Sequence, residues 1–313
     1  MSALLQPGQV PGARPAAEAL PDAARHLPGP EGVRLAVRRF ARNRLAVVGL
    51  GLVGFFILFC FVGPYLYPTD QTHTTLSQVN LAPSAKHLLG TDAVGHDELG
   101  RLMFGGKVSL LVGLAAGILA TVIGTLWGAA AGYAGGWIDA AMMRVVDAGI
   151  AIPALFILLV VSAISTPDTF GLVIILGFVS WLVPSRLIRA ETLTLKNRDY
   201  VLTLRAIGGT HTRAVTRHIL PNSVSTIIVA ATFQVADAIL LIAYVSYLGL
   251  GVRPPATDWG GMLSAGLTAA YSGRWWLIVP PGLAIILVVC AFNAIGDGLR
   301  DAFDARTGPG GRG

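Results

Sequence analysis

The sequence predicts an all-α, polytopic membrane protein with six transmembrane helices and both termini in the cytoplasm. Only 13% of its 313 residues are charged, whereas soluble domains usually carry about 25%, and its mean hydropathy is +0.66. Several apolar runs approach the ~20 residues that a helix needs to cross a bilayer. These runs do not alternate between polar and apolar residues, as the strands of a membrane barrel do.

The chain begins with a segment that we expect to be a disordered cytoplasmic tail, residues 1–34. This segment is rich in Ala, Pro and Gly, lacks periodicity, and has no apolar core of the kind found in a signal peptide. Residues 35–67 start with several arginines and continue as an apolar run, which indicates an uncleaved first span over Leu45–Tyr67 with its N-terminus inside. Residues 68–107 are polar with few basic residues, so we expect them outside.

Residues 108–298 are predicted to hold the other five spans. The second span carries glycines at positions 124, 128, 132 and 136, a stripe of small residues that lets two helix backbones approach closely. Proline at position 184 is expected to kink the fourth span near its end. The five spans are predicted at Val108–Tyr133, Gly149–Ser165, Phe170–Ile188, Ser223–Val252 and Leu277–Gly296.

The distribution of positive charge supports this topology. The model with both ends inside puts 18 of the 23 basic residues in cytoplasmic segments and five outside, as the positive-inside rule requires. The cytoplasmic residues counted lie in the N-terminal tail and the basic stretch after it, in the connection between the second and third spans with Arg144, at Arg186 and Arg189, in a loop at residues 190–221 and in a C-terminal tail at residues 299–313. The basic isoelectric point, about 9.7, is therefore explained by loop charge, and no nucleic-acid partner is expected.

Motif-like strings in the chain do not indicate catalysis. The string GLGLVG at Gly49–Gly54 lies inside a predicted span rather than between a strand and a helix. Gly106-Lys107 lacks the following Ser or Thr of a phosphate-binding loop. The group His96-Asp97-Glu98 lacks a second pair of ligands and is interpreted as a structural polar turn. We expect no catalytic residue, no bound cofactor and no metal in this chain.

Asp237 lies near the middle of the fifth span, where a carboxylate is costly and usually faces a bundle interior or a watery path. Gln234 and Tyr244 share roughly the same helical face. Two interpretations remain open: these three residues line a translocation pathway, or a neighbouring helix satisfies the carboxylate.

The polar, basic interval Asp199–Asn222 separates two long apolar runs. We expect a helix over Tyr200–Ala206 and a break at Gly208-Gly209, followed by a second helix that Thr210 or Thr212 caps and Pro221 ends. The apolar face of the first helix is expected to contain Val201, Leu204 and Ala206. This face has two interpretations: it lies on the membrane interface, or it docks into the groove of a cytoplasmic partner.

At these residues the sequence resembles the membrane subunits of bacterial ABC importers, whose cytoplasmic loop carries an EAA–Gly–LeuPro pattern. Gly208 and Leu220-Pro221 match this pattern at the right spacing. Leu202-Thr203-Leu204 stands where the EAA triplet is usual, and the Glu is missing. Docking through this loop is therefore expected to be more apolar than in related subunits.

Three further strings are similar to the dipeptide, oligopeptide and nickel type of permease. They are Leu88–Gly113, Ser246–Leu263 and Phe292–Arg306, so the resemblance covers roughly Leu35–Arg306. In two places the chain departs from the family: His96 stands where Arg is usual, and Ile242 stands where relatives often carry Glu.

The resemblance implies a permease like those of type I ABC importers, multi-pass in the bacterial inner membrane. It implies half of a heterodimeric channel in the lipid bilayer, with a homologous second permease, two cytoplasmic ATPase subunits that bind ATP and Mg²⁺, and an extracytoplasmic solute-binding protein. Trp259, Trp275 and Trp276 are candidates for contact with that binding protein. The expected ATPase-coupling residues are Asp199, Tyr200, Leu202, Leu204, Arg205, Ala206, Gly208, Gly209, Leu220 and Pro221.

Peptides are the expected solute, with nickel or other small solutes as an alternative. Two other classes of protein are also considered. A secondary transporter would use Asp237 as an ion-coupling carboxylate, although no internal duplication is evident. A membrane-embedded enzyme would need a clustered catalytic set, which the sequence does not indicate.

Overall fold

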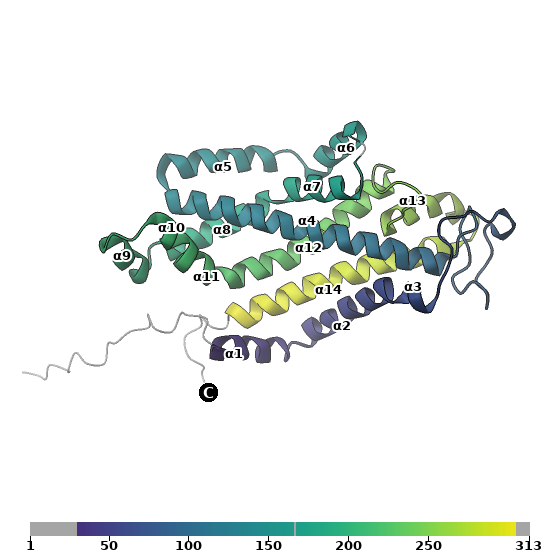
Figure 1. Cartoon of the computed structure of the whole chain (residues 1–313), viewed down its shortest axis with the longest axis horizontal. Coiled ribbons are helices and arrows are strands. Elements are labelled where there is room, and N and C mark those ends of the chain that lie inside the picture. The colour runs from purple at the N-terminus through teal and green to yellow at the C-terminus, as the bar shows by residue number, and fades with distance from the viewer. Residues whose placement is uncertain (1–29, 166, 305–313) are drawn as a thin grey trace, which may run out of the picture.

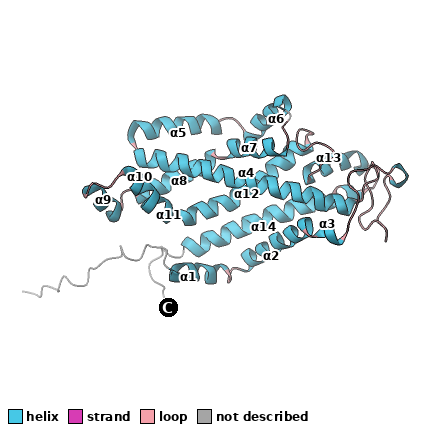
Figure 2. Cartoon of the chain, in the orientation of Figure 1, coloured by secondary structure: helices cyan, strands magenta, loops and turns pink. Residues whose placement is uncertain are grey.

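The computed structural model describes residues 30–165 and 167–304, which are helices joined by loops and turns (Figures 1 and 2). In that part of the chain the β pairing is a single bridge between Thr91 and Asp97, so the all-α prediction is confirmed. The longer helices are α1 (Pro30–Phe40), α2 (Arg44–Phe61), α4 (Glu98–Ala134), α5 (Gly136–Ile150), α6 (Ala154–Ser165), α7 (Thr169–Ser180), α8 (Leu182–Leu195), α9 (Asp199–Ala206), α12 (Val224–Tyr247), α13 (Trp259–Ala270) and α14 (Val279–Asp304). The short ones are α3 (Gly63–Leu66), η2 (Leu76–Gln78), α10 (His211–Ala214), the π-helix η3 (Val215–Ile219), α11 (Leu220–Asn222) and η4 (Trp275–Leu277).

The central helix of the fold is α4, which packs against α2, α5, α7, α8 and α12. Its 37 residues give a length of about 55 Å, well beyond the ~30 Å hydrocarbon core of a bilayer. The helix begins at Glu98, and the side chain of Asp97 caps it by accepting a hydrogen bond from the Gly100 amide at 2.9 Å. The predicted start at Val108 was wrong because the polar first turns of α4 had been assigned to the outer segment.

The glycines of α4 form the expected close contact with α8. A Cβ atom added at Gly128 would overlap the carbonyl oxygen of Ser185, and one at Gly132 would lie 2.9 Å from the carbonyl oxygen of Arg189. The predicted small-residue stripe is therefore confirmed at positions 124, 128 and 132. It was wrong at Gly136, which begins α5 and has open space around it.

Four helical segments are long and apolar enough to cross a membrane alone, namely α2, α4, α12 and residues 275–303. Two bent pairs, α5–α6 and α7–α8, turn by 75° and 45° and bring the number to six if each pair is one span. The third span, predicted at Gly149–Ser165, in fact starts with α5. α5 was not predicted because Asp139 and Asp147 suggested a polar loop. In the structure both aspartates form ion pairs with arginines of α8.

The bend between α7 and α8 falls at Trp181, close to the predicted kink at Pro184. Proline has no amide hydrogen, so the carbonyl oxygen four residues earlier, that of Ser180, loses its helical partner. The side chain of Gln234 on α12 donates a hydrogen bond to this carbonyl oxygen at 2.8 Å. The hydrogen bond from Gln234 thus replaces the missing helical hydrogen bond and connects the α7–α8 bend to α12.

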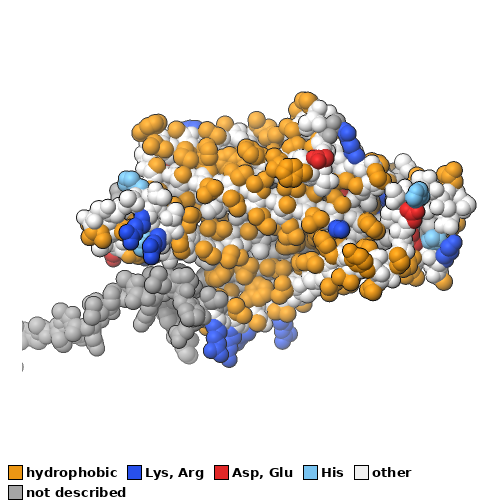
Figure 3. All heavy atoms as spheres, viewed as in Figure 1, with side chains coloured by type: hydrophobic (Ala, Val, Ile, Leu, Met, Phe, Trp, Pro, Cys, Tyr) orange, Lys and Arg blue, Asp and Glu red, His pale blue; other side chains and the backbone are white. Residues whose placement is uncertain are grey.

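The described ends of the chain lie together. α1 and the end of α14 are at the same end of the molecule as α9, α10 and α11, and the segment after α3 lies with α13 at the other end (Figure 1). Hydrophobic side chains cover most of the surface between these ends (Figure 3). This arrangement makes the chain a polytopic membrane protein.

Two predicted boundaries near the termini were wrong. The tail predicted to reach residue 34 already becomes helical at Pro30, and residues 1–29 lie outside the described part. The C-terminal tail predicted from residue 299 is still helical to Asp304, since α14 packs against α1 and α2 there, and residues 305–313 lie outside the described part.

Candidate functional site

The polar interval after α8 has the local structure expected from its sequence. α9 spans Asp199–Ala206, and Gly208 follows with a φ of +81°, a conformation that side chains with a Cβ rarely adopt. The side chain of Thr210 then caps α10 by accepting a hydrogen bond from the Arg213 amide. The predicted break and the Thr210 cap are confirmed.

The second helix of the interval differs from the prediction. It is α-helical only over His211–Ala214 and then continues as the π-helix η3, Val215–Ile219. Pro221 does not end this helix, because it lies in the first turn of α11, where its missing amide hydrogen has no helical acceptor to lose. The chain therefore passes from α10 to α12 through short helical turns rather than through a single stop.

The exposed side of α9 is not the predicted one. Val201 is fully buried, and Leu204 lies against Gly209. Leu202 is 45% exposed and Ile207 is 76% exposed, so the apolar surface at this tip consists of these two side chains. Ala206 is exposed beside them, and the side chain of Arg205 lies outside the described part. Ile207 was missed because it follows the helix and no helical periodicity includes it.

Side-chain hydrogen bonds hold this interval to the long helices. Tyr133, at the end of α4, bonds to the His211 ring at 3.0 Å, and Lys196 donates to the carbonyl oxygen of Gly132 at 2.8 Å. Tyr200 on α9 receives a hydrogen bond from Asn222 on α11, and partial burial raises the pKa of its hydroxyl. The residues on both sides of α9 are therefore attached to α4, and α9 itself is attached to α11, just before α12.

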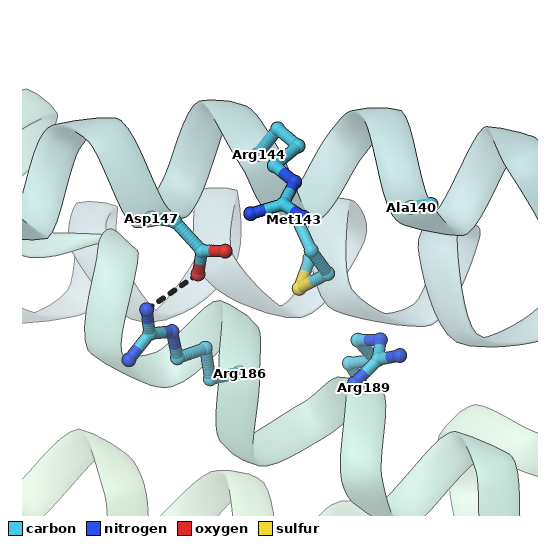
Figure 4. A pocket seen from close by; sticks show the side chains of 6 residues that line it. All are labelled: Ala140, Met143, Arg144, Asp147, Arg186 and Arg189. Atoms are coloured by element: carbon cyan, nitrogen blue, oxygen red, sulfur yellow. Dashed lines mark hydrogen bonds and ion pairs between the residues drawn. The ribbon is translucent and has the colours of Figure 1, made fainter.

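A groove of about 400 Å³ lies between α5 and α8 (Figure 4). We call it the arginine groove, and it is lined by Ala140, Met143, Arg144, Asp147, Arg186 and Arg189. Arg189 forms a two-point ion pair with Asp139, with nitrogen–oxygen distances of 2.5 and 2.7 Å. One nitrogen of Arg186 lies 2.5 Å from Asp147. Arg144 is exposed and has no ion-pair partner in the described part of the chain.

A second cavity, of about 380 Å³, is lined by residues of α5, α6, α7, α8 and α12 and of the short α5–α6 connection. We call it the Asp237 cavity because this carboxylate lines it together with Gln234 and Tyr244. The prediction that these three residues share a face is confirmed, but their role in a pathway stays a prediction. Gln234 is nearly buried and bonds to Ser180, whereas Asp237 is exposed and has no hydrogen-bond partner among the described residues.

Polar residues at the opposite end of the molecule hold the outer segment together. Asp97 caps α4 and contacts both Tyr67, at 3.0 Å, and His87, at 2.9 Å. His96 lies between Asp92 and Arg101. These contacts agree with the structural polar turn predicted at His96-Asp97-Glu98.

The tryptophans near α13 are mostly buried. Trp259 has no exposed surface and donates a hydrogen bond to the carbonyl oxygen of Leu102, so its predicted contact with a partner was wrong. Trp276 is 9% exposed and donates to the carbonyl oxygen of Thr91, whereas Trp275 is 54% exposed. Asp258 caps α13, and its complete burial raises the pKa of its carboxyl to about 6.

Two family descriptions match the sequence in separate parts. Residues 124–309 match the binding-protein-dependent transport system inner membrane component. Residues 33–83 match the N-terminal transmembrane domain of oligopeptide transport permease C. Together they include the long helices of the described part of the chain, except part of α4 and the first three residues of α1.

Individual relatives align over nearly the whole chain. The dipeptide transport system permease protein DppC of Bacillus subtilis is 36% identical over 271 residues, which cover 87% of this chain and 85% of the relative. The oligopeptide transport system permease protein OppC of Haemophilus influenzae is 37% identical, with coverages of 87% and 90%. A protein of Brucella suis, provisionally named as a peptide permease, is 41% identical with the same coverages.

Proposed function

The chain belongs to the family of binding-protein-dependent transport system inner membrane components, and we propose that it is the permease subunit of an ATP-driven importer of short peptides. It is a multi-pass protein of the bacterial inner membrane. The named relatives are dipeptide and oligopeptide permeases, which favours peptides over nickel or another small solute. The full complex would contain a second, homologous permease, two ATPase subunits and a solute-binding protein.

The observation that carries the coupling role is the position of α9. This short helix lies at one end of the molecule, outside the apolar body (Figures 1 and 3), and it exposes Leu202 and Ile207. α9 itself is hydrogen-bonded through Tyr200 to Asn222 of α11, just before α12, and the following α10 is hydrogen-bonded through His211 to the end of α4. In our proposal an ATPase subunit receives this apolar tip, and the attached long helices move when the ATPase subunits close on ATP and Mg²⁺. The chain itself contributes no catalytic residue.

The pathway role is proposed for the face that carries the Asp237 cavity. Gln234, Asp237 and Tyr244 line this cavity, and Asp237 is unpaired among the described residues. An unpaired carboxylate at membrane depth belongs beside water or protein rather than hydrocarbon. In our proposal the second permease covers this face, so that each subunit forms half of the pathway.

Co-purification and transport with a charged α9 tip test the proposal. We expect the chain, extracted from native membranes, to bring with it an ATPase and a second permease. Ile207→Glu should reduce the recovered ATPase at least about threefold, because a charge replaces an apolar contact. The matched control is Leu76→Glu, which changes an 80% exposed leucine at the opposite end of the molecule and should leave ATPase recovery unchanged.

Two results would contradict this proposal. Equal ATPase recovery from wild type and Ile207→Glu would remove the docking role of α9. Solute uptake by the purified chain alone, driven by an ion gradient without ATP, would favour a secondary transporter with Asp237 as its ion-coupling carboxylate.

A further inference from the structure

The arginine groove and the Asp237 cavity adjoin each other on one side of the molecule. On α5, Asp147 of the groove is followed two residues later by Gly149 of the cavity. On α8, Arg186 of the groove follows Leu182 of the cavity by one helical turn. Neighbouring lining residues of the two cavities therefore form one surface along α5 and α8, which reaches the middle of α12.

This surface is unsuited to contact with lipid chains. The side chains of Arg186 and Asp147 are 48% and 44% exposed, and Arg144 and Asp237 are also exposed. All four lie on helices that belong to candidate membrane spans. Charged groups at such depth face water or protein because exposure to hydrocarbon is costly. The surface thus has the polarity of a solute path.

The two ends of the surface carry opposite excess charge. In the arginine groove, three guanidinium groups face two carboxylates, and Arg144 is the one without a carboxylate partner in the described part. Figure 4 shows the Arg186 side chain reaching from α8 toward Asp147 on α5, and the Arg144 side chain lying over α5. At the other end, Asp237 has no cationic partner among the described residues. An anionic group therefore fits the groove, and a cationic group fits the cavity.

The distance between these ends can be derived from the helices. Gln234 bonds to the Ser180 carbonyl, which sets the two helices in register. Arg186 lies six residues beyond Ser180 toward the α9 end, and Asp237 lies three residues beyond Gln234 in the opposite direction. At about 1.5 Å per residue, the two positions are at most roughly 13 Å apart along the helix axes, because the 45° bend between α7 and α8 shortens the separation. An extended peptide of about four residues spans this length.

We propose that the arginine groove receives the free carboxylate of a short peptide in transit, while Asp237 receives its free amino group. This inference rests on the proposed function as a peptide permease. A linear peptide carries these two charges at its opposite ends, so the surface recognises the ends of the main chain and tolerates any side chains between them. Arg144 is the main anion-binding residue in this proposal because it has no competing ion pair, and Arg186 assists it.

Transport of three forms of one tetrapeptide tests the proposal. The complete complex with its binding protein is reconstituted in liposomes and supplied with tetraalanine, its C-terminal amide or its N-acetyl derivative, after the affinity of the binding protein for each form has been measured. The variants are Arg144→Gln and Asp237→Asn, and the matched control is Arg42→Gln, an exposed arginine away from both cavities. The same binding protein is used with every variant. Its own preference among the three peptides therefore cancels when the uptake ratio of a variant is divided by that of wild type.

We expect Arg144→Gln to lower the preference for the free acid over the amide by about three- to tenfold, the range between an exposed and a desolvated charge contact. Its preference for the free amine over the acetylated form should not change. Asp237→Asn should show the reverse pattern, and Arg42→Gln should change neither ratio. Arg144→Lys keeps the charge and should restore most of the preference for the free acid.

Other outcomes would overturn the inference in distinguishable ways. Unchanged ratios in actively transporting variants, or an equal loss for all three peptides, would remove the terminal-charge role and leave the proposed function standing. Failure of the wild-type complex to transport any peptide would instead contradict the proposed function. Loss of a co-purified anionic phospholipid from Arg144→Gln, with unchanged peptide ratios, would identify a lipid headgroup as the occupant of the groove.

Discussion

Gly208 combines a positive φ with open space. Its φ is +81°, and no atom lies within 4 Å of the position that a Cβ would occupy. A valine there meets no neighbour, but it costs about 1–3 kcal/mol in backbone strain unless the turn changes shape. We expect Gly208→Val to reorient α9 and to reduce peptide uptake relative to ATP hydrolysis, measured together in proteoliposomes, by at least about threefold.

The control for this effect is Gly249→Val. Gly249 has a φ of +80° and equally open space, but it lies after α12 at the other end of the molecule. The two substitutions should cost similar backbone strain, so only Gly208→Val should separate hydrolysis from uptake. The same ratio of uptake to hydrolysis in both variants would count against a coupling role for Gly208.

The carboxyl of Asp258 predicts a pH-dependent stability. Burial raises its pKa from 3.8 to about 6 in the folded protein, so the folded state binds this proton more tightly than the unfolded state does. Its contribution to the free energy of unfolding is therefore complete below pH ~4 and is lost as the pH rises through about 6. The loss is of the order of 3 kcal/mol for a shift of this size.

Thermal unfolding in detergent between pH 4 and pH 8 measures this contribution. Asp258→Asn cannot ionise, and its amide oxygen can still accept the hydrogen bond from the Gly261 amide that caps α13. The stability of wild type relative to Asp258→Asn should fall across this range. A constant difference between the two proteins would mean that Asp258 does not titrate with a raised pKa.

The contact between α4 and α8 depends on glycine. A Cβ at Gly128 would overlap the carbonyl oxygen of Ser185, so Gly128→Ala should force the two helices apart and cost about 1–3 kcal/mol. Gly51 on α2 has nothing within 4 Å of its Cβ position. Gly51→Ala should be neutral or slightly stabilising because alanine is the better helix former.

Melting temperatures of the two purified variants, compared with that of wild type, check this prediction. Only Gly128→Ala should melt earlier. If both alanines behaved alike, the close approach of α4 and α8 would contribute no measurable stability.

The sequence predicted the helical elements best where local composition alone determines them. α2, α12 and α14 are long apolar runs, and each was placed within a few residues at its N-terminal end. α5 was missed for a non-local reason. The acidic residues of α5 are neutralised by arginines 39 and 50 positions later in the chain, and no local pattern reveals such pairing.

The candidate site shows the same division. The Gly208 break and the Thr210 cap follow from the conformational preferences of single residues and were predicted. The exposed face of α9 depends on packing against Gly209 and the following turns, so the sequence did not reveal the exposure of Ile207, whereas Leu202 was among the expected coupling residues. The arginine groove could not be predicted from the sequence, because its lining residues come together only when α5 packs against α8.

At the scale of the whole molecule, both described chain ends and the α9 tip lie at one end. We therefore expect Thr203→Cys and Arg42→Cys to be protected from a membrane-impermeant maleimide in intact spheroplasts and labelled after permeabilisation. Ser77→Cys, in the outer segment, should be labelled without permeabilisation. All three positions are exposed.

The protein that carries these single cysteines needs one substitution, so that its own exposed cysteine is not labelled. Cys290 is exposed and is replaced by alanine, whereas Cys60 is fully buried and can remain. Labelling of Thr203→Cys and Arg42→Cys in intact spheroplasts would exclude the arrangement with both ends in the cytoplasm.

The hydrogen bond between Gln234 and the carbonyl of Ser180 has a mechanical consequence. We expect the α7–α8 bend to act as a hinge, since Pro184 removes one backbone hydrogen bond there. The Ser180 carbonyl oxygen that lost its helical partner accepts a hydrogen bond from Gln234 of α12, the helix that begins just after α11. Opening or closing the hinge must therefore carry α12 along or break this bond. We therefore expect a displacement of the α9 end of α12 to change the angle between α7 and α8 beside the Asp237 cavity, which Ser180 and Gln234 line.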